Sequence, residues 1–140
     1  GTVSAAVEGA IVGIPSVAIS QLGKAKFDYT VAAQFAKKAF ELITNDPLPP
    51  HIVLNINVPE GAKSLDFEVT KTGKRDYGGP FEKRFDPRGS PYYWIGGDAY
   101  RFEDIEGSDC NAIVAGKISV TPLEINLTSQ TYVEKIKHWK

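Results

Sequence analysis

Residues 1–20 read GTVSAAVEGAIVGIPSVAIS, and this stretch decides the fold because it joins a helix of small residues to a short apolar strand. Apolar residues recur at helical spacing from Val3 to Ile11, and Gly13 is placed to end the helix. The run 14–20 that follows is bounded by turn residues and is typical of a buried strand in a parallel sheet.

The same alternation continues downstream. A second helix is predicted over about residues 28–44, because its apolar positions, Phe35 and Phe40 among them, fall at i, i+3, i+4 spacing. A strand is predicted over residues 52–59, after an extended proline linker. Strands that alternate with helices indicate a parallel sheet covered on both faces.

The pattern changes after Pro59 to short strands separated by turns, predicted over residues 67–71, 75–77, 81–85 and 91–95. Gly73 and the Gly78-Gly79 pair are assigned to the hairpin turns rather than to phosphate binding. We expect this hairpin-rich region to project from the α/β core, with its exposed aromatic side chains forming an interface.

The last third contains one more strand and two more helices. An acidic loop covers residues 103–109, and Ser108 or Asp109 is expected to cap a short helix over residues 110–115. A strand over 117–123 and an amphipathic helix that begins at Ser129 complete the chain. We expect one partial domain over 1–140, divided into the rest of the core (1–60), a hairpin-rich extension (61–100) and the last strand with the C-terminal helix (101–140).

Composition excludes several classes of protein. Hydrophobic residues make up 42% and charged residues 24%, which is ordinary for a globular domain. The net charge of −1 gives no strong field toward a nucleic-acid duplex or a membrane surface, and no apolar run could span a bilayer. The lone Cys110 and the lack of a signal peptide favour the cytoplasm. Because the chain opens inside a helix and without methionine, we expect it to be the later part of a larger protein.

The sequence gives little support for a metal site. His51 and His138 are far apart, and neither has a second ligand at helical spacing. Cys110 has no C-x-x-C partner and is expected to be a small buried hydrophobe. The acidic loop 103–109 lacks the order of a calcium-binding loop and is interpreted as solvated.

The start of the first helix is the strongest candidate site. Free backbone N–H groups, the helix dipole and the Thr2 hydroxyl converge there, and Gly1 lets a ligand approach the backbone closely. Gly1 and Thr2 are therefore predicted to bind a phosphate. An ordinary N-cap formed by Thr2 explains the same residues equally well.

With these residues in view, the whole chain resembles the C-terminal portion of the SurE family of survival proteins, which are metal-dependent phosphatases acting on nucleoside monophosphates. The resemblance rests on segments that occur in one order: residues 1–9 (GTVSAAVEG), 13–20 (GIPSVAIS), 54–59 (LNINVP), 70–77 (TKTGKRDY), 86–94 (DPRGSPYYW), 107–109 (GSD) and 118–123 (ISVTPL).

The resemblance implies a Rossmann-like, three-layer α/β/α fold with a projecting hairpin region and a C-terminal helix. It implies that Mg²⁺ or Mn²⁺ is held by ligands upstream of this chain, so that no catalytic residue or metal ligand lies within it. Gly1 and Thr2 match a family segment that borders the metal and phosphate site. A homodimer or homotetramer is implied through the ribbon 75–97 and the helix 129–140.

Two other functions stay open on the residues alone. The chain could act as a nonenzymatic dimerisation module if its 140 residues were the whole protein. It could also bind nucleotides without turning them over. The full-length protein is expected to be a 5′-nucleotidase, with this chain inactive alone.

Overall fold

The structure is a computed structural model that describes residues 1–23, 28–76, 81–94 and 101–139. Helices and strands follow each other in the order α1 (Thr2–Ile11), β1 (Ser16–Gln21), α2 (Thr30–Asn45), β2 (Ile52–Val58), β3 (Phe67–Val69), β4 (Arg75–Asp76), β5 (Glu82–Phe85), β6 (Pro91–Trp94), β7 (Arg101–Phe102), α3 (Asp109–Val114), β8 (Ile118–Glu124), α4 (Gln130–Ile136) and a short 3₁₀ helix (Lys137–Trp139).

The central sheet is mixed, with the strand order β1-β2-β8-β3. Strands β1 and β2 are parallel, as predicted, but β8 runs antiparallel to β2, and β3 runs parallel to β8. The direction of β8 was not predicted; this strand begins beside the end of β2, where Ser119 pairs with Asn57.

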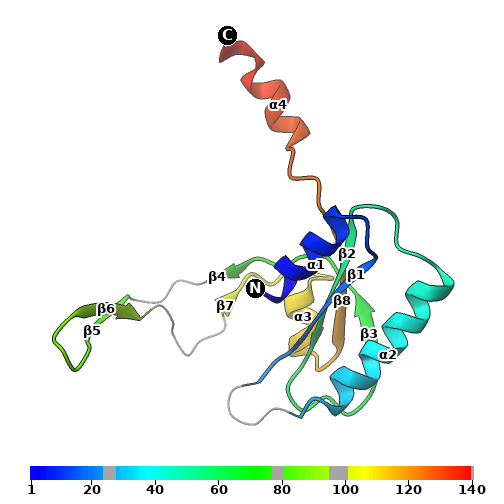
Figure 1. Ribbon diagram of the computed structural model, residues 1–140, viewed down its shortest axis with the longest axis horizontal. Coiled ribbons are helices and arrows are strands. Elements are labelled where there is room, and N and C mark those ends of the chain that lie inside the picture. The colour runs from blue at the N-terminus through cyan, green and yellow to red at the C-terminus, as the bar shows by residue number, and fades with distance from the viewer. Residues whose placement is uncertain (24–27, 77–80, 95–100, 140) are drawn as a thin grey trace.

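Helices cover both faces of the sheet, which gives three layers. Figure 1 shows α1 and α3 on one side of the sheet and α2 on the other. Alternate residues of a strand point to opposite faces, and the buried residues divide accordingly. Ala6 and Ala10 of α1 pack on Ala18 and Val53, whereas Ala32, Phe35 and Ala39 of α2 pack on Ile56, Val58 and Ile118.

The first helix begins one residue earlier than predicted. Gly1, not Thr2, is the N-cap of α1, and no side chain caps this helix. The Gly1 carbonyl already accepts a hydrogen bond from the Ser4 N–H at 3.2 Å, which places Thr2 inside the first turn. Gly13 follows the helix with φ of 84°, as predicted for its end.

The second helix also differs in detail. It begins at Thr30, whose N–H donates to the Asp28 carboxylate at 2.9 Å. Phe40, predicted to lie on the buried face, is 67% exposed, whereas Phe35 is buried. The buried stripe of this helix is therefore narrower than its apolar spacing suggests.

The middle of the chain forms two ribbons that extend away from the sheet (Figure 1). Strand β5 pairs with β6 and β4 pairs with β7, both antiparallel. Strand β7 was not predicted, because two residues carry no periodic pattern. Tyr77, the Gly78-Gly79 pair and residues 95–97, which the sequence assigned to turns and strand ends, lie outside the described residues.

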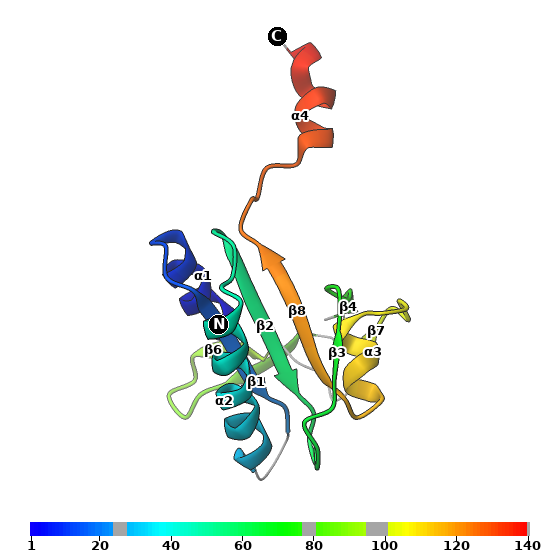
Figure 2. The same cartoon turned by 90° about the vertical axis from the view of Figure 1, so that its right-hand side faces the viewer.

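The C-terminal helix stands apart from the sheet in both views (Figure 2). It begins as predicted after Ser129, whose hydroxyl accepts a hydrogen bond from the Tyr132 N–H at 3.3 Å. None of the residues of α4 is buried. Among the described residues, no helix has the length and apolarity needed to cross a membrane.

Candidate phosphate site

The first turn of α1 lies at the carboxyl end of the two parallel strands. Gly9 sits against Ser16, since a Cβ built on Gly9 would come within 2.4 Å of the Ser16 hydroxyl oxygen. Helix α1 runs antiparallel to β1 (Figure 1). A helix rises about 1.5 Å and a strand about 3.3 Å per residue, so Thr2 reaches the level of about Ile19 to Ser20. Ligands of open α/β sheets bind at this edge.

A row of polar side chains crosses the sheet at the same end and on the same face. Ser20 of β1 pairs with Asn57 of β2, which pairs with Ser119 of β8. The Asn57 amide donates to the Ser119 hydroxyl at 3.3 Å, and Ser119 is fully buried. Farther along α1, Ala6 and Ala10 pack on Ala18 and Val53, and Gly9 lies against Ser16. Ser20, Asn57 and Ser119 therefore form a polar floor at the level of the helix start.

The helix start itself is suited to an anion. The first N–H groups of a helix have no partner four residues back; in α1 the Ser4 N–H donates to the Gly1 carbonyl instead, and the helix has neither a side-chain cap nor an acidic residue in its first turn. The positive end of the helix dipole is therefore uncompensated by its own side chains. Gly1 and Thr2 are exposed, and a Cβ on Gly1 would lie 2.6 Å from the Ser4 hydroxyl oxygen. The hydroxyls of Thr2 and Ser4 can donate to the same ligand as the N–H groups.

The remaining candidates from the sequence do not assemble a metal centre. Within the described ranges, no group of three His, Cys, Asp or Glu side chains could hold a metal ion. In the acidic loop, Glu103 pairs with Lys74, and Asp104 accepts a hydrogen bond from the Asn111 amide at 2.7 Å. Asp109 accepts hydrogen bonds from two backbone N–H groups, both at 2.8 Å. These carboxylates therefore bind protein partners.

Three further predictions concern the segment around α3. Ser108 is the N-cap of this helix, and its hydroxyl accepts from the Asn111 N–H at 3.2 Å. The assignment of Gly73 to a hairpin turn is wrong, because β3 pairs with β8 and β4 with β7. Gly73 lies against α3 instead, since a Cβ there would come within 2.8 Å of the Asp109 carboxylate and 2.9 Å of the Cys110 sulfur. Cys110 is half-buried rather than fully buried, and burial together with Asp109 raises the pKa of its thiol. A neutral thiol of this kind is a poor nucleophile.

The polar floor was missed by the sequence interpretation. Ser20 and Asn57 sit at the ends of two predicted strands, yet which residues face each other across them depends on register. The available signal was Asn57 itself, a polar residue within a strand that is otherwise mostly apolar. Ser119 could not be placed beside it without knowing that β8 runs antiparallel.

The family model for survival protein SurE matches residues 1–79, which is more than half of the chain. This chain belongs to the SurE family. The matched residues include the helix start with Gly1 and Thr2 and, in the central sheet, strands β1, β2 and β3.

Relatives and a solved structure agree with this assignment over the entire chain. The chain is 43% identical to 5′-nucleotidase SurE of Myxococcus xanthus, with 100% of the chain and 54% of the relative covered. It is 44% identical to 5′-nucleotidase SurE of Geobacter sulfurreducens, with 99% and 54% covered. The crystal structure of the SurE protein from Aquifex aeolicus superposes with a TM-score of 0.78 at 36% identity, covering 99% of this chain and 56% of that one. The chain thus spans about half the length of the curated relatives it matches.

Proposed function

We propose that this chain is part of a divalent-metal-dependent phosphohydrolase that releases phosphate from nucleoside monophosphates, and that Gly1 and Thr2 bind the phosphate. The observation that carries the proposal is the uncapped first turn of α1, set beside the polar floor at the carboxyl edge of the sheet. SurE relatives that match the chain are named 5′-nucleotidases, which gives the substrate class.

The role of this chain in the reaction is to hold the phosphoryl group. The N–H groups of Thr2 and Val3 and the Thr2 hydroxyl donate to the phosphoryl oxygens. Charge spreads over these oxygens in the transition state of phosphoryl transfer, and fixed donors stabilise it without reorganising. The Asn57 amide lies at the level of the helix start and is held by its hydrogen bond to the buried Ser119 hydroxyl.

The described residues at this site do not fit a divalent cation. They supply hydroxyls, N–H groups and one amide but no carboxylate, whereas Mg²⁺ and Mn²⁺ sites are built on one or more carboxylates. We therefore assign the cation, Mg²⁺ or Mn²⁺, to ligands outside residues 1–140. On this proposal the chain alone is inactive, and the activity belongs to the complete protein.

The proposal is tested by phosphate release from AMP by the complete protein that contains this chain. Activity is expected with added Mg²⁺ or Mn²⁺ and is expected to disappear in EDTA, returning when the metal is restored. Activity that persists after thorough chelation would contradict the metal dependence. Binding of AMP without any phosphate release would favour the nucleotide-binding alternative.

We also propose that the protein forms a homodimer or homotetramer through the hairpin region and the C-terminal helix. Strands β5 and β6 are exposed at every position, including Phe85, Tyr93 and Trp94 at 62%, 62% and 56%. Trp139 beyond α4 is 71% exposed. Exposed aromatic side chains of this density are typical of protein interfaces.

We propose separately that the protein is located in the cytoplasm.

A further inference from the structure

Asn57 lies on the face of the sheet that α1 covers. Alternate residues of a strand point to the same face, and Val53 of β2 packs on α1, so Asn55 and Asn57 point to the α1 face as well. Helix α1 also packs on Ala18 of β1. The helix therefore lies over both strands, and its start extends toward the pair formed by Ser20 and Asn57.

The level of Asn57 along the sheet matches that of a ligand at the helix start. A ligand bound to the N–H groups of Thr2 and Val3 lies one hydrogen-bond length, about 3 Å, ahead of the helix. That distance brings the ligand to about the level of Ser20 of β1. Asn57 is the residue of β2 that pairs with Ser20. Its side chain therefore rises from the sheet at the level of the ligand.

The Asn57 carboxamide has hydrogen-bonding positions that no described residue uses. An amide nitrogen carries two protons, and the oxygen accepts further bonds. Among the described residues, the side chain makes one hydrogen bond, the donation to the Ser119 hydroxyl at 3.3 Å. Ser119 is fully buried and holds the amide, whereas Asn57 is half-buried and open to solvent. One N–H is therefore left for a ligand.

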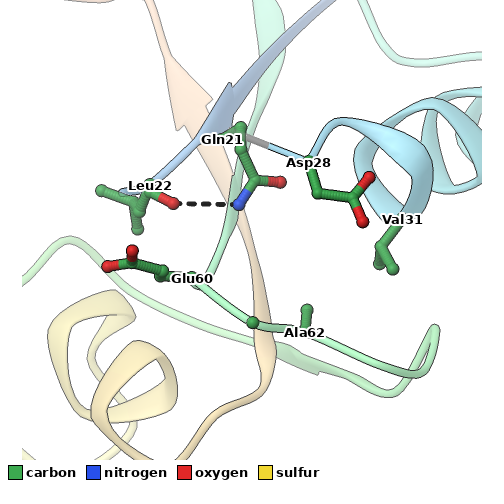
Figure 3. A pocket seen from close by; sticks show the side chains of 7 residues that line it. Gln21, Leu22, Asp28, Val31, Glu60 and Ala62 are labelled. Atoms are coloured by element: carbon green, nitrogen blue, oxygen red, sulfur yellow. Dashed lines mark hydrogen bonds between the residues drawn. The ribbon is translucent and has the colours of Figure 1, made fainter. Parts of the chain in front are cut away.

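A second carboxamide at this edge of the sheet serves another purpose. Gln21 follows Ser20, so its side chain points to the α2 face. Its nitrogen donates to the carbonyls of Leu22 at 2.9 Å and Pro59 at 3.2 Å, and Figure 3 shows the first of these bonds. The Gln21 N–H groups are thus used by the backbone. Of these two amides, Asn57 is the one that lies beside the start of α1.

We propose that the Asn57 carboxamide binds the phosphoryl group at the start of α1, donating the N–H that Ser119 does not use. The inference rests on the proposed function and adds a residue to the same site. A hydrogen bond to a charged oxygen is stronger than one between neutral groups. Because Ser119 holds the amide before the ligand arrives, the donor needs little reorganisation. The contact is made with substrate and with released phosphate alike.

The test measures the Kd for inorganic phosphate by calorimetry in the complete protein with Mg²⁺, together with the KM for AMP. Asn57→Ala should raise both about tenfold, as for loss of a hydrogen bond to a charged group, and should change kcat less than KM. Asn57→Asp keeps the shape but places a carboxylate beside the phosphate, so it should raise the Kd further.

Asn55→Ala is the matched control, because Asn55 is the same residue type on the same strand and face, one pair farther from the helix start. It should leave the Kd and the KM unchanged. A purely structural Asn57 would instead lower the thermal midpoint of Asn57→Ala and leave the Kd as it is.

An unchanged Kd in Asn57→Asp overturns the assignment, and so does an equal rise in Asn55→Ala. Asn57→Asp remains decisive if Asn57→Ala fails to fold. AMP turnover with an unchanged Kd in both Asn57 variants would remove Asn57 from the site and leave the proposed function standing. Phosphate binding that depends on Asn57, without any phosphate release from AMP, would sink the proposed function alone.

Discussion

The hydroxyls of Thr70 and Thr121 lie 2.7 Å apart, and neither residue is more than 6% exposed. This hydrogen bond connects the residue that follows β3 to β8, on the face of the sheet that α3 covers. Thr70→Val should lower the free energy of unfolding by about 1–3 kcal/mol, because it leaves the Thr121 hydroxyl buried without this partner. Urea denaturation of the single variant measures the loss.

The double variant Thr70→Val/Thr121→Val is the control for that prediction. Replacing both hydroxyls by methyl groups leaves no buried orphan, so we expect stability close to that of the wild type. A double variant that loses the sum of the two single losses would show that the hydroxyls act independently, through other partners.

The local patterns of the sequence predicted most of the core. Helix α1, strand β1, helix α2 and strand β2 each lie within a few residues of the predicted ranges, because each carries its own periodicity and end signals. Strand β8 was also found, but its direction was not. Direction depends on where the chain enters the sheet, and residues 59–117 separate β2 from β8.

The candidate site was predicted only in part. Gly1 and Thr2 were proposed as phosphate ligands because a helix start is visible in the sequence, although Thr2 does not make the predicted cap. The floor made by Asn57 and Ser119 follows from pairing between distant strands. No local pattern encodes those relationships.

The Cys110 thiol should react slowly with iodoacetamide. Burial raises the pKa of this thiol, and Asp109 beside it acts in the same direction. A raised pKa means less thiolate at pH 8 and a half-maximal alkylation rate at higher pH than for a free cysteine. Protein unfolded in urea should alkylate at the ordinary rate. Native protein that reacts as fast as free cysteine at pH 8 would show that the thiol is not shielded.

The β5–β6 ribbon should control assembly. Tyr93→Ser/Trp94→Ser removes two exposed aromatic side chains from β6 and should shift the complete protein toward smaller species in light scattering, since exposed aromatics supply much of the affinity of an interface. Phe40→Ser, at an equally exposed site on α2, should leave the mass unchanged. If both variants keep the wild-type mass, the ribbon is not the interface.

Thr2 distinguishes a phosphate ligand from a helix cap. Thr2→Val should weaken competitive inhibition by inorganic phosphate about five- to tenfold, the equivalent of about one hydrogen bond, while Thr2→Ser keeps the hydroxyl and should stay near the wild type. Because α1 has no side-chain cap, the thermal midpoint should not fall in either variant. A fall in the midpoint of Thr2→Val with unchanged inhibition would return Thr2 to the role of a cap.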